Sequence, residues 1–235
     1  DHHSHMKADR LQDAIIRGVQ RAERSYPIAV GLICILQRTK SVAENEKWVD
    51  FALQPDNQFI GLDLADNEVD FDPEPFVPLF HKAKDNGLGI TVHAGEPNVH
   101  GISRNIRTAI EQMGADRIGH GLQAIEDPEV VSLLLTTEVP LELCPTSNVL
   151  TGACASIETH PFKALLDAGV KVTINTDDPG IMCTNLQHEY DLWNHAFKID
   201  IKSFEACNAW ALDTSFIAST KKKAAWDKRF QSTPS

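Results

Sequence analysis

Short apolar runs alternate with amphipathic stretches over most of the chain. About six apolar runs, the one at Arg117 being very short, are bounded by turn residues, which is typical of buried strands. These runs cover residues 28–36, 59–64, 88–93, 117–118, 139–143 and 170–175. Between them the apolar positions repeat at helical spacing, which predicts helices over residues 8–24, 41–52, 74–85, 102–113, 129–136 and 160–167.

The alternation of strand and helix predicts parallel strands joined by helical crossovers. After Asp178 the pattern is wholly helical, and we expect further helices over residues 186–197, 201–212 and 221–230. The expected fold class is therefore α/β, a (β/α)8 barrel of the TIM type that forms a single domain over residues 1–235.

A closed barrel of this type needs eight strands, whereas the pattern supplies about six. We expect about the first two strands to be absent from this chain and a longer natural polypeptide to supply them, because the outer strands would otherwise have unpaired edges. Residues 1–6, Asp-His-His-Ser-His-Met, are interpreted either as a tag remnant or as a native loop.

Composition narrows the possible functions. The chain has 235 residues, 42% of them hydrophobic, and a formal net charge of −11, which argues against nucleic acid and anionic membranes as partners and favours a small molecule. No apolar run approaches the ~18 residues of a membrane helix and no secretory pattern is visible, so a cytoplasmic location is expected. The five cysteines are scattered without a C-x-x-C pair, which predicts neither disulfides nor a thiolate zinc site.

Three of the predicted strands end in residues that can bind metal or transfer protons. Thr91-Val92-His93-Ala94-Gly95-Glu96 places an imidazole and a carboxylate at one strand end, where His93 suits zinc and Glu96 suits proton transfer. Taken alone, this segment also fits a strand-end histidine that bonds a carbonyl and a glutamate that caps the next helix.

The next strand ends in Ile118-Gly119-His120-Gly121, where the two glycines permit a close approach of ligand or water to His120. An ordinary turn histidine is the alternative. Asp177 and Asp178 follow the last strand in Thr176-Asp177-Asp178-Pro179-Gly180, so one carboxylate can bind metal while its neighbour meets the substrate. A plain Asp-Asp-Pro-Gly turn is the alternative there.

Taken together, three strands that end in such residues at one barrel edge are explained better by hydrolytic zinc chemistry than by three unrelated turns. The segments T-V-H-A-G-E, R-I-G-H-G, L-C-P-T-S-N and N-T-D-D-P-G also closely resemble those of the adenosine deaminase family of zinc-dependent amidohydrolases. The likeness extends in order over nearly the whole chain.

The resemblance implies one Zn²⁺ and a small-molecule purine nucleoside substrate, adenosine or 2'-deoxyadenosine. It implies that His93 and Asp177 bind zinc, that Glu96 donates a proton to the purine ring, that His120 lies beside the attacking hydroxide, and that Asp178 accepts a hydrogen bond from the substrate.

Two positions depart from the family pattern. The family's His-x-His pair, which supplies two more zinc ligands, ends no strand here, and His3-Ser4-His5 follows no apolar run. In Gly61-Leu62-Asp63-Leu64-Ala65-Asp66, which resembles the family's substrate-contacting segment, Asp66 stands where glycine is usual. A protein with an incomplete metal site and no activity, and a deaminase of adenine or another aminopurine, are therefore the alternatives. The sequence leaves the oligomeric state open.

Overall fold

The fold is built on one parallel sheet. The computed structural model describes residues 8–231, so the interpretation of residues 1–6 and the His3-Ser4-His5 pair lie outside the described residues. Six strands pair in the simple order β1-β2-β3-β4-β5-β6, with every neighbouring pair parallel. Their bounds are β1 Leu32–Gln37, β2 Phe59–Ala65, β3 Gly89–Ala94, β4 Arg117–His120, β5 Leu141–Leu143 and β6 Val172–Ile174.

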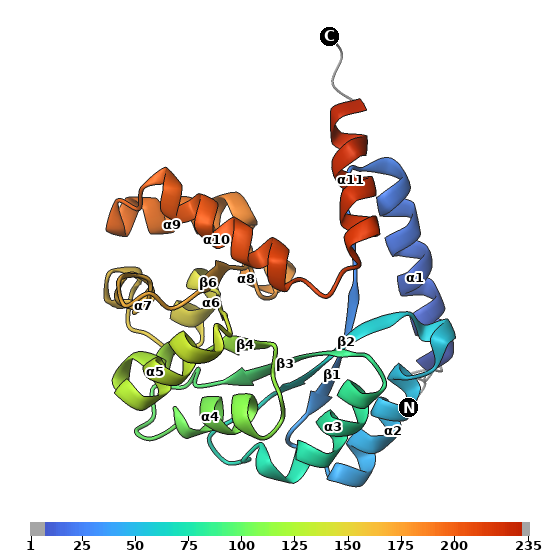
Figure 1. Cartoon of the computed structure of the whole chain (residues 1–235), viewed down its shortest axis with the longest axis horizontal. Helices are drawn as coiled ribbons and strands as arrows, with labels where there is room; N and C mark the ends of the chain where they lie inside the picture. The colour runs from blue at the N-terminus through green and yellow to red at the C-terminus, as the bar shows by residue number, and fades with distance from the viewer. Residues whose placement is uncertain (1–7, 232–235) are drawn as a thin grey trace.

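Helices connect the strands and pack on the sheet, as the alternating pattern predicts (Figure 1). Leu, Ile and Val side chains of the strands are buried together with the facing sides of these helices in one continuous core. The helices are α1 Ala8–Ser25, α2 Val42–Ala52, α3 Val77–Asp85, α4 Arg104–Glu111, α5 Pro128–Thr137, α6 Pro145–Leu150, α7 Phe162–Asp167, α8 Pro179–Met182, α9 Leu186–Phe197, α10 Ile201–Thr214 and α11 Ser219–Gln231, with short 3-10 turns η1 Pro55–Asn57, η2 Glu74–Phe76, η3 Leu122–Glu126 and η4 Ile157–Thr159.

All six predicted strands are present, but several are shorter than predicted. The strand predicted at 28–36 begins only at Leu32, because its neighbour β2 begins at Phe59, directly opposite Leu32. Residues before Leu32 therefore have no partner strand, and the backbone N–H of Val30 instead donates to the carboxylate of Glu23 at 2.8 Å. An apolar run extends as a strand only where a neighbouring backbone is available for hydrogen bonding.

The sheet is open within residues 8–231. β1 and β6 each pair with a single neighbour, and the strands follow one another in the sheet in chain order, all in the same direction. This is the arrangement of six consecutive strands of a (β/α)8 barrel. Helix α11 returns to lie beside α1, where Lys221 pairs with Glu23 at 2.8 Å (Figure 1).

Helices α6 and α8 lie in the segments that follow β5 and β6, and the sequence pattern does not predict them. Each is too short to show helical periodicity and each has proline at its first turn, which suits the start of a helix. α6 proves important because it supplies several residues behind the site described next. None of the described helices is long and apolar enough to cross a membrane.

Candidate active site

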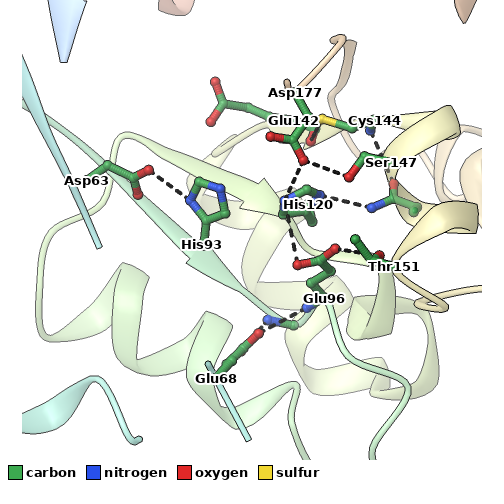
Figure 2. Close-up of polar contacts among 12 residues, drawn as sticks. Asp63, Glu68, His93, Glu96, His120, Glu142, Cys144, Ser147, Thr151 and Asp177 are labelled. Carbon is green, nitrogen blue, oxygen red and sulfur yellow. Dashed lines mark hydrogen bonds and ion pairs between the residues drawn. The ribbon is translucent and has the colours of Figure 1, made fainter. Parts of the chain in front are cut away.

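Neighbouring strand ends converge on one cavity. The carboxyl ends of β3 to β6 lie along the same edge of the sheet because these strands are parallel and adjacent. A cavity of about 430 Å³ opens at this edge, and its lining includes His93, His120, Glu142, Cys144 and Asp177. The structure therefore brings three of the predicted site residues, His93, His120 and Asp177, to one cavity (Figure 2).

His93 extends from β3 across the backbone of the next strand. It is in register with Gly119 of β4, and a Cβ atom at residue 119 would lie 3.0 Å from its Nδ1 atom and 3.2 Å from its Cα atom. Glycine at 119 therefore leaves the space that the imidazole of His93 occupies beside β4.

A buried carboxylate holds one side of the His93 ring. Oδ2 of Asp63 lies 2.8 Å from Nδ1 of His93, and the Asp63 side chain is only 5% exposed (Figure 2). Burial by itself lowers the pKa of His93, but the Asp63 carboxylate outweighs this effect and raises that pKa to about 9. A carboxylate on one ring nitrogen is the usual support of a metal-binding histidine, and Nε2 of His93 would become a ligand atom when a metal ion displaces its proton.

His120 ends β4 with a left-handed backbone, φ 62°. Its Nδ1 lies 2.9 Å from the side-chain amide nitrogen of Asn148. Its Nε2 lies 3.7 Å from Oε2 of Glu96 and 3.8 Å from Oδ2 of Asp177 (Figure 2). Burial lowers the pKa of His120 against the opposing effect of Glu96, so the ring is held toward its neutral form.

The turn after β3 holds Glu96 beside His120. The backbone N–H groups of Gly95 and Glu96 donate to the carboxylate of Glu68 at 2.5 and 3.1 Å, and Asn105 donates to the same carboxylate at 3.0 Å. Thr151 donates to Oε1 of Glu96 at 3.0 Å. The Glu96 carboxylate is therefore positioned by both its backbone and its side chain. Burial raises the pKa of Glu68 despite the hydrogen bond from Gly95.

Asp177 reaches the cavity from the loop after β6. Its backbone is left-handed, φ 54°, and Ser147 of α6 donates to its Oδ2 at 2.7 Å. The side chain is 23% exposed, so the carboxylate lies at the cavity wall and remains accessible to a ligand.

Asp66 and Asp178, the two predicted substrate contacts, do not line the cavity. Asp178 is exposed at the amino end of α8, where its backbone carbonyl accepts hydrogen bonds from Ile181 and Met182. Asp66 is exposed after β2, and its carboxylate accepts from Thr39 and from the backbone of Asn67. Its φ of 87° lies in the left-handed region, which explains physically why glycine suits this position.

Several residues that hold the site were not singled out from the sequence. They are Asp63, Glu68, Ser147, Asn148 and Thr151. The sequence could have indicated a role for Asp63, because a carboxylate inside an apolar strand needs a partner. Ser147 and Asn148 lie in the L-C-P-T-S-N segment that was recognised without a role for each position. Glu68 had no signal, since an isolated glutamate in a loop is ordinarily solvated.

A parallel sheet with histidine, glutamate and aspartate at adjoining strand ends defines the class of barrel hydrolases with active sites at the carboxyl edge. The sequence profile described as adenosine deaminase matches residues 2–230. The chain belongs to the adenosine deaminase family, which confirms the resemblance noted in the sequence.

Individual relatives agree with this assignment. The chain is 36% identical to the adenosine deaminase of Plasmodium gallinaceum over 220 residues, which are 91% of this chain and 59% of that protein. It is similar in structure to an adenine deaminase from Arthrobacter aurescens, with a TM-score of 0.86, 25% identity, and coverage of 95% of this chain and 67% of the other.

A zinc-bound amidohydrolase from Burkholderia ambifaria gives a TM-score of 0.81 at 26% identity, and the likeness covers 95% of this chain and 63% of the other. The predicted fold, six strands of a (β/α)8 barrel, is confirmed by the sheet and by these structures. The chain spans about 60% of the length of the curated relatives that it matches.

The donor atoms of the cavity suit a metal ion in part. Among the described residues, one group of three donors lies within 4.8 Å of one another: His120, Cys144 and Asp177. Cys144 is a poor ligand, because burial and the nearby Asp177 raise the pKa of its thiol well above the usual value and thus keep it protonated. His93, whose Nδ1 is held by Asp63, and Asp177 are the better matched pair of donors.

Proposed function

We propose that the protein containing this chain catalyses the hydrolytic deamination of adenosine or 2'-deoxyadenosine. Water and the nucleoside give inosine or deoxyinosine and ammonia. The observation that carries the proposal is the meeting of two carboxylates, Glu96 and Asp177, at Nε2 of His120 within 3.7 and 3.8 Å. Membership of the adenosine deaminase family supports the choice of reaction. The substrate is a small purine, and the cytoplasm is the predicted location.

His93 and Asp177 would hold Zn²⁺ in this proposal. The ion-paired Nδ1 of His93 and the accessible carboxylate of Asp177 fit that role, and at least one further ligand is needed because a catalytic zinc ordinarily has three protein ligands. When bound, zinc lowers the pKa of water toward neutrality and thereby makes it a nucleophile at neutral pH.

The remaining residues act on protons and orientation. Glu96 donates a proton to the purine ring nitrogen next to the carbon under attack, which draws off the charge that develops there. His120 orients the attacking water. Asp178 accepts a hydrogen bond from the substrate, and Asp66 lies where the purine approaches β2. Because neither aspartate lines the cavity, a bound substrate has to extend from the cavity over the loops that carry them.

A spectrophotometric assay tests the proposal. Zinc-replete protein should convert adenosine and 2'-deoxyadenosine, and absence of turnover with every adenine nucleoside would reject it. Free adenine belongs in the same panel, because the similar structure from Arthrobacter aurescens is an adenine deaminase. Turnover of adenine alone would keep the reaction and change the substrate.

A further inference from the structure

A chain of hydrogen bonds leads away from His120 into the protein interior. The backbone N–H of Phe162 donates to Nδ1 of His160 at 3.0 Å. Nε2 of His160 lies 3.1 Å from Oδ1 of Asn148, whose amide nitrogen lies 2.9 Å from Nδ1 of His120. The side chains of His120, Asn148 and His160 are all buried, so water does not compete for these bonds.

The direction of each bond follows from the donor at the far end. A backbone N–H can only donate, so Nδ1 of His160 accepts from Phe162 and the hydrogen of the neutral ring is on Nε2. Burial lowers the pKa of His160 to about 3, so the ring is neutral at physiological pH. Nε2 of His160 therefore donates to Oδ1 of Asn148.

A second donor orients the amide of Asn148. The backbone N–H of Cys144 also donates to Oδ1, at 3.2 Å. Rotation of the amide by 180° would set its NH₂ group against both donors. Its NH₂ group must therefore face His120, and Nδ1 of His120 must be the acceptor.

We propose that Asn148 and His160 are positioning residues that hold neutral His120 in the tautomer with its hydrogen on Nε2. The inference rests on the proposed function, in which His120 acts on the attacking water. Nε2–H points toward the space between Glu96 and Asp177 (Figure 2). In this tautomer Nε2 has no free lone pair, so His120 donates a hydrogen bond to the attacking oxygen and does not take a proton from it.

The tautomer can be read directly without turnover. In protein labelled with ¹⁵N-histidine, long-range ¹H–¹⁵N correlations distinguish a protonated ring nitrogen from a bare one, and the His120 signal is assigned by its loss in His120→Asn. We expect His120 and His160 in the unsubstituted protein to be protonated at Nε2 and bare at Nδ1. A protonated Nδ1 of His120 at neutral pH would overturn the proposal, and this measurement needs no substitution at Asn148.

Replacement of the amide by a carboxylate tests cause and effect. Asn148→Asp keeps the shape but offers only acceptors to His120, so Nδ1 of His120 should become protonated. In zinc-replete protein kcat should fall by about 10²–10⁴-fold, as for a catalytic histidine held in the wrong tautomer, with KM changed by less than about threefold. Asn194→Asp adds the same charge on an exposed position of α9 and should alter neither the tautomer nor kcat.

The role of His160 has its own variant. His160→Phe keeps an aromatic ring against Trp193, whose centroid lies 4.6 Å away, but removes the donor to Asn148. Part of the His120 population should then be protonated at Nδ1. An unchanged His120 spectrum in this variant would refute the part assigned to His160, and an unchanged spectrum and kcat in Asn148→Asp would refute the whole proposal. If the unsubstituted protein has no turnover, the proposed reaction fails while the spectra still decide the tautomer.

Discussion

Glu68 is expected to set the position of Glu96, and its replacement should damage both stability and catalysis. Its buried carboxylate accepts hydrogen bonds from the backbone of Gly95 and of Glu96 and from Asn105. Glu68→Ala removes all three acceptor contacts. The N–H of Gly95 and the amide of Asn105 are then left buried without this partner, because both residues are buried.

The magnitude follows from these two buried donors. A buried donor that loses its partner costs about 1–3 kcal/mol, so Glu68→Ala should lower the free energy of unfolding by about 2–6 kcal/mol. That is a large part of the ~5–15 kcal/mol that stabilises a typical domain. Glu68→Gln with its amide oxygen in place of Oε1 keeps the acceptor of both Gly95 and Asn105 and loses only the acceptor of the Glu96 N–H, so it should cost less than Glu68→Ala.

Two measurements check this prediction. Urea denaturation gives the free energy of unfolding, and native-state hydrogen exchange reports the protection of the Gly95 amide. Glu129→Gln is the matched control, because Glu129 is an exposed partner of Arg107, and this change should cost less than about 0.5 kcal/mol. A loss below about 1 kcal/mol in Glu68→Ala, or unchanged exchange at Gly95, would show that Glu68 does not hold the turn.

Three further predictions concern the site. Glu96→Gln should reduce kcat by about 10²–10⁴-fold because a general acid is lost, and steady-state kinetics with normal turnover would exclude that role. His93→Ala should lower bound zinc measured by atomic absorption to well below that of unsubstituted protein, and equal zinc in both would remove His93 from the ligand set. The buried neutral His160, whose folded-state pKa of about 3 lies below the unfolded value of ~6.5, makes the unfolded state bind more protons between these values. Stability should therefore fall by up to about 1.4 kcal/mol per pH unit as pH drops from 6.5 toward 3, and denaturation of His160→Phe should lack this part of the slope.

The strand and helix pattern was predictable because burial on both faces of a parallel sheet leaves long apolar runs. The residues at which the strands begin and end were less predictable. β1 begins where β2 offers backbone partners, which is a property of the pair, and helix α6 is too short to show a period of its own. The start of β1 depends on its pairing with a strand about 27 residues further along the chain, and a local sequence pattern carries no information about that pairing.

By itself, the sequence determined that His93, His120 and Asp177 would come near one another, because each follows an apolar run and parallel strands end at one edge. Only the tertiary structure decided how they are held. The left-handed backbones of His120 and Asp177, the carboxylates of Asp63 and Glu68, and the tautomer set through Asn148 all depend on contacts between distant segments. Spacing along a chain predicts which side chains meet, but the direction of a hydrogen bond and the charge of a buried ring are set by the atoms packed around them.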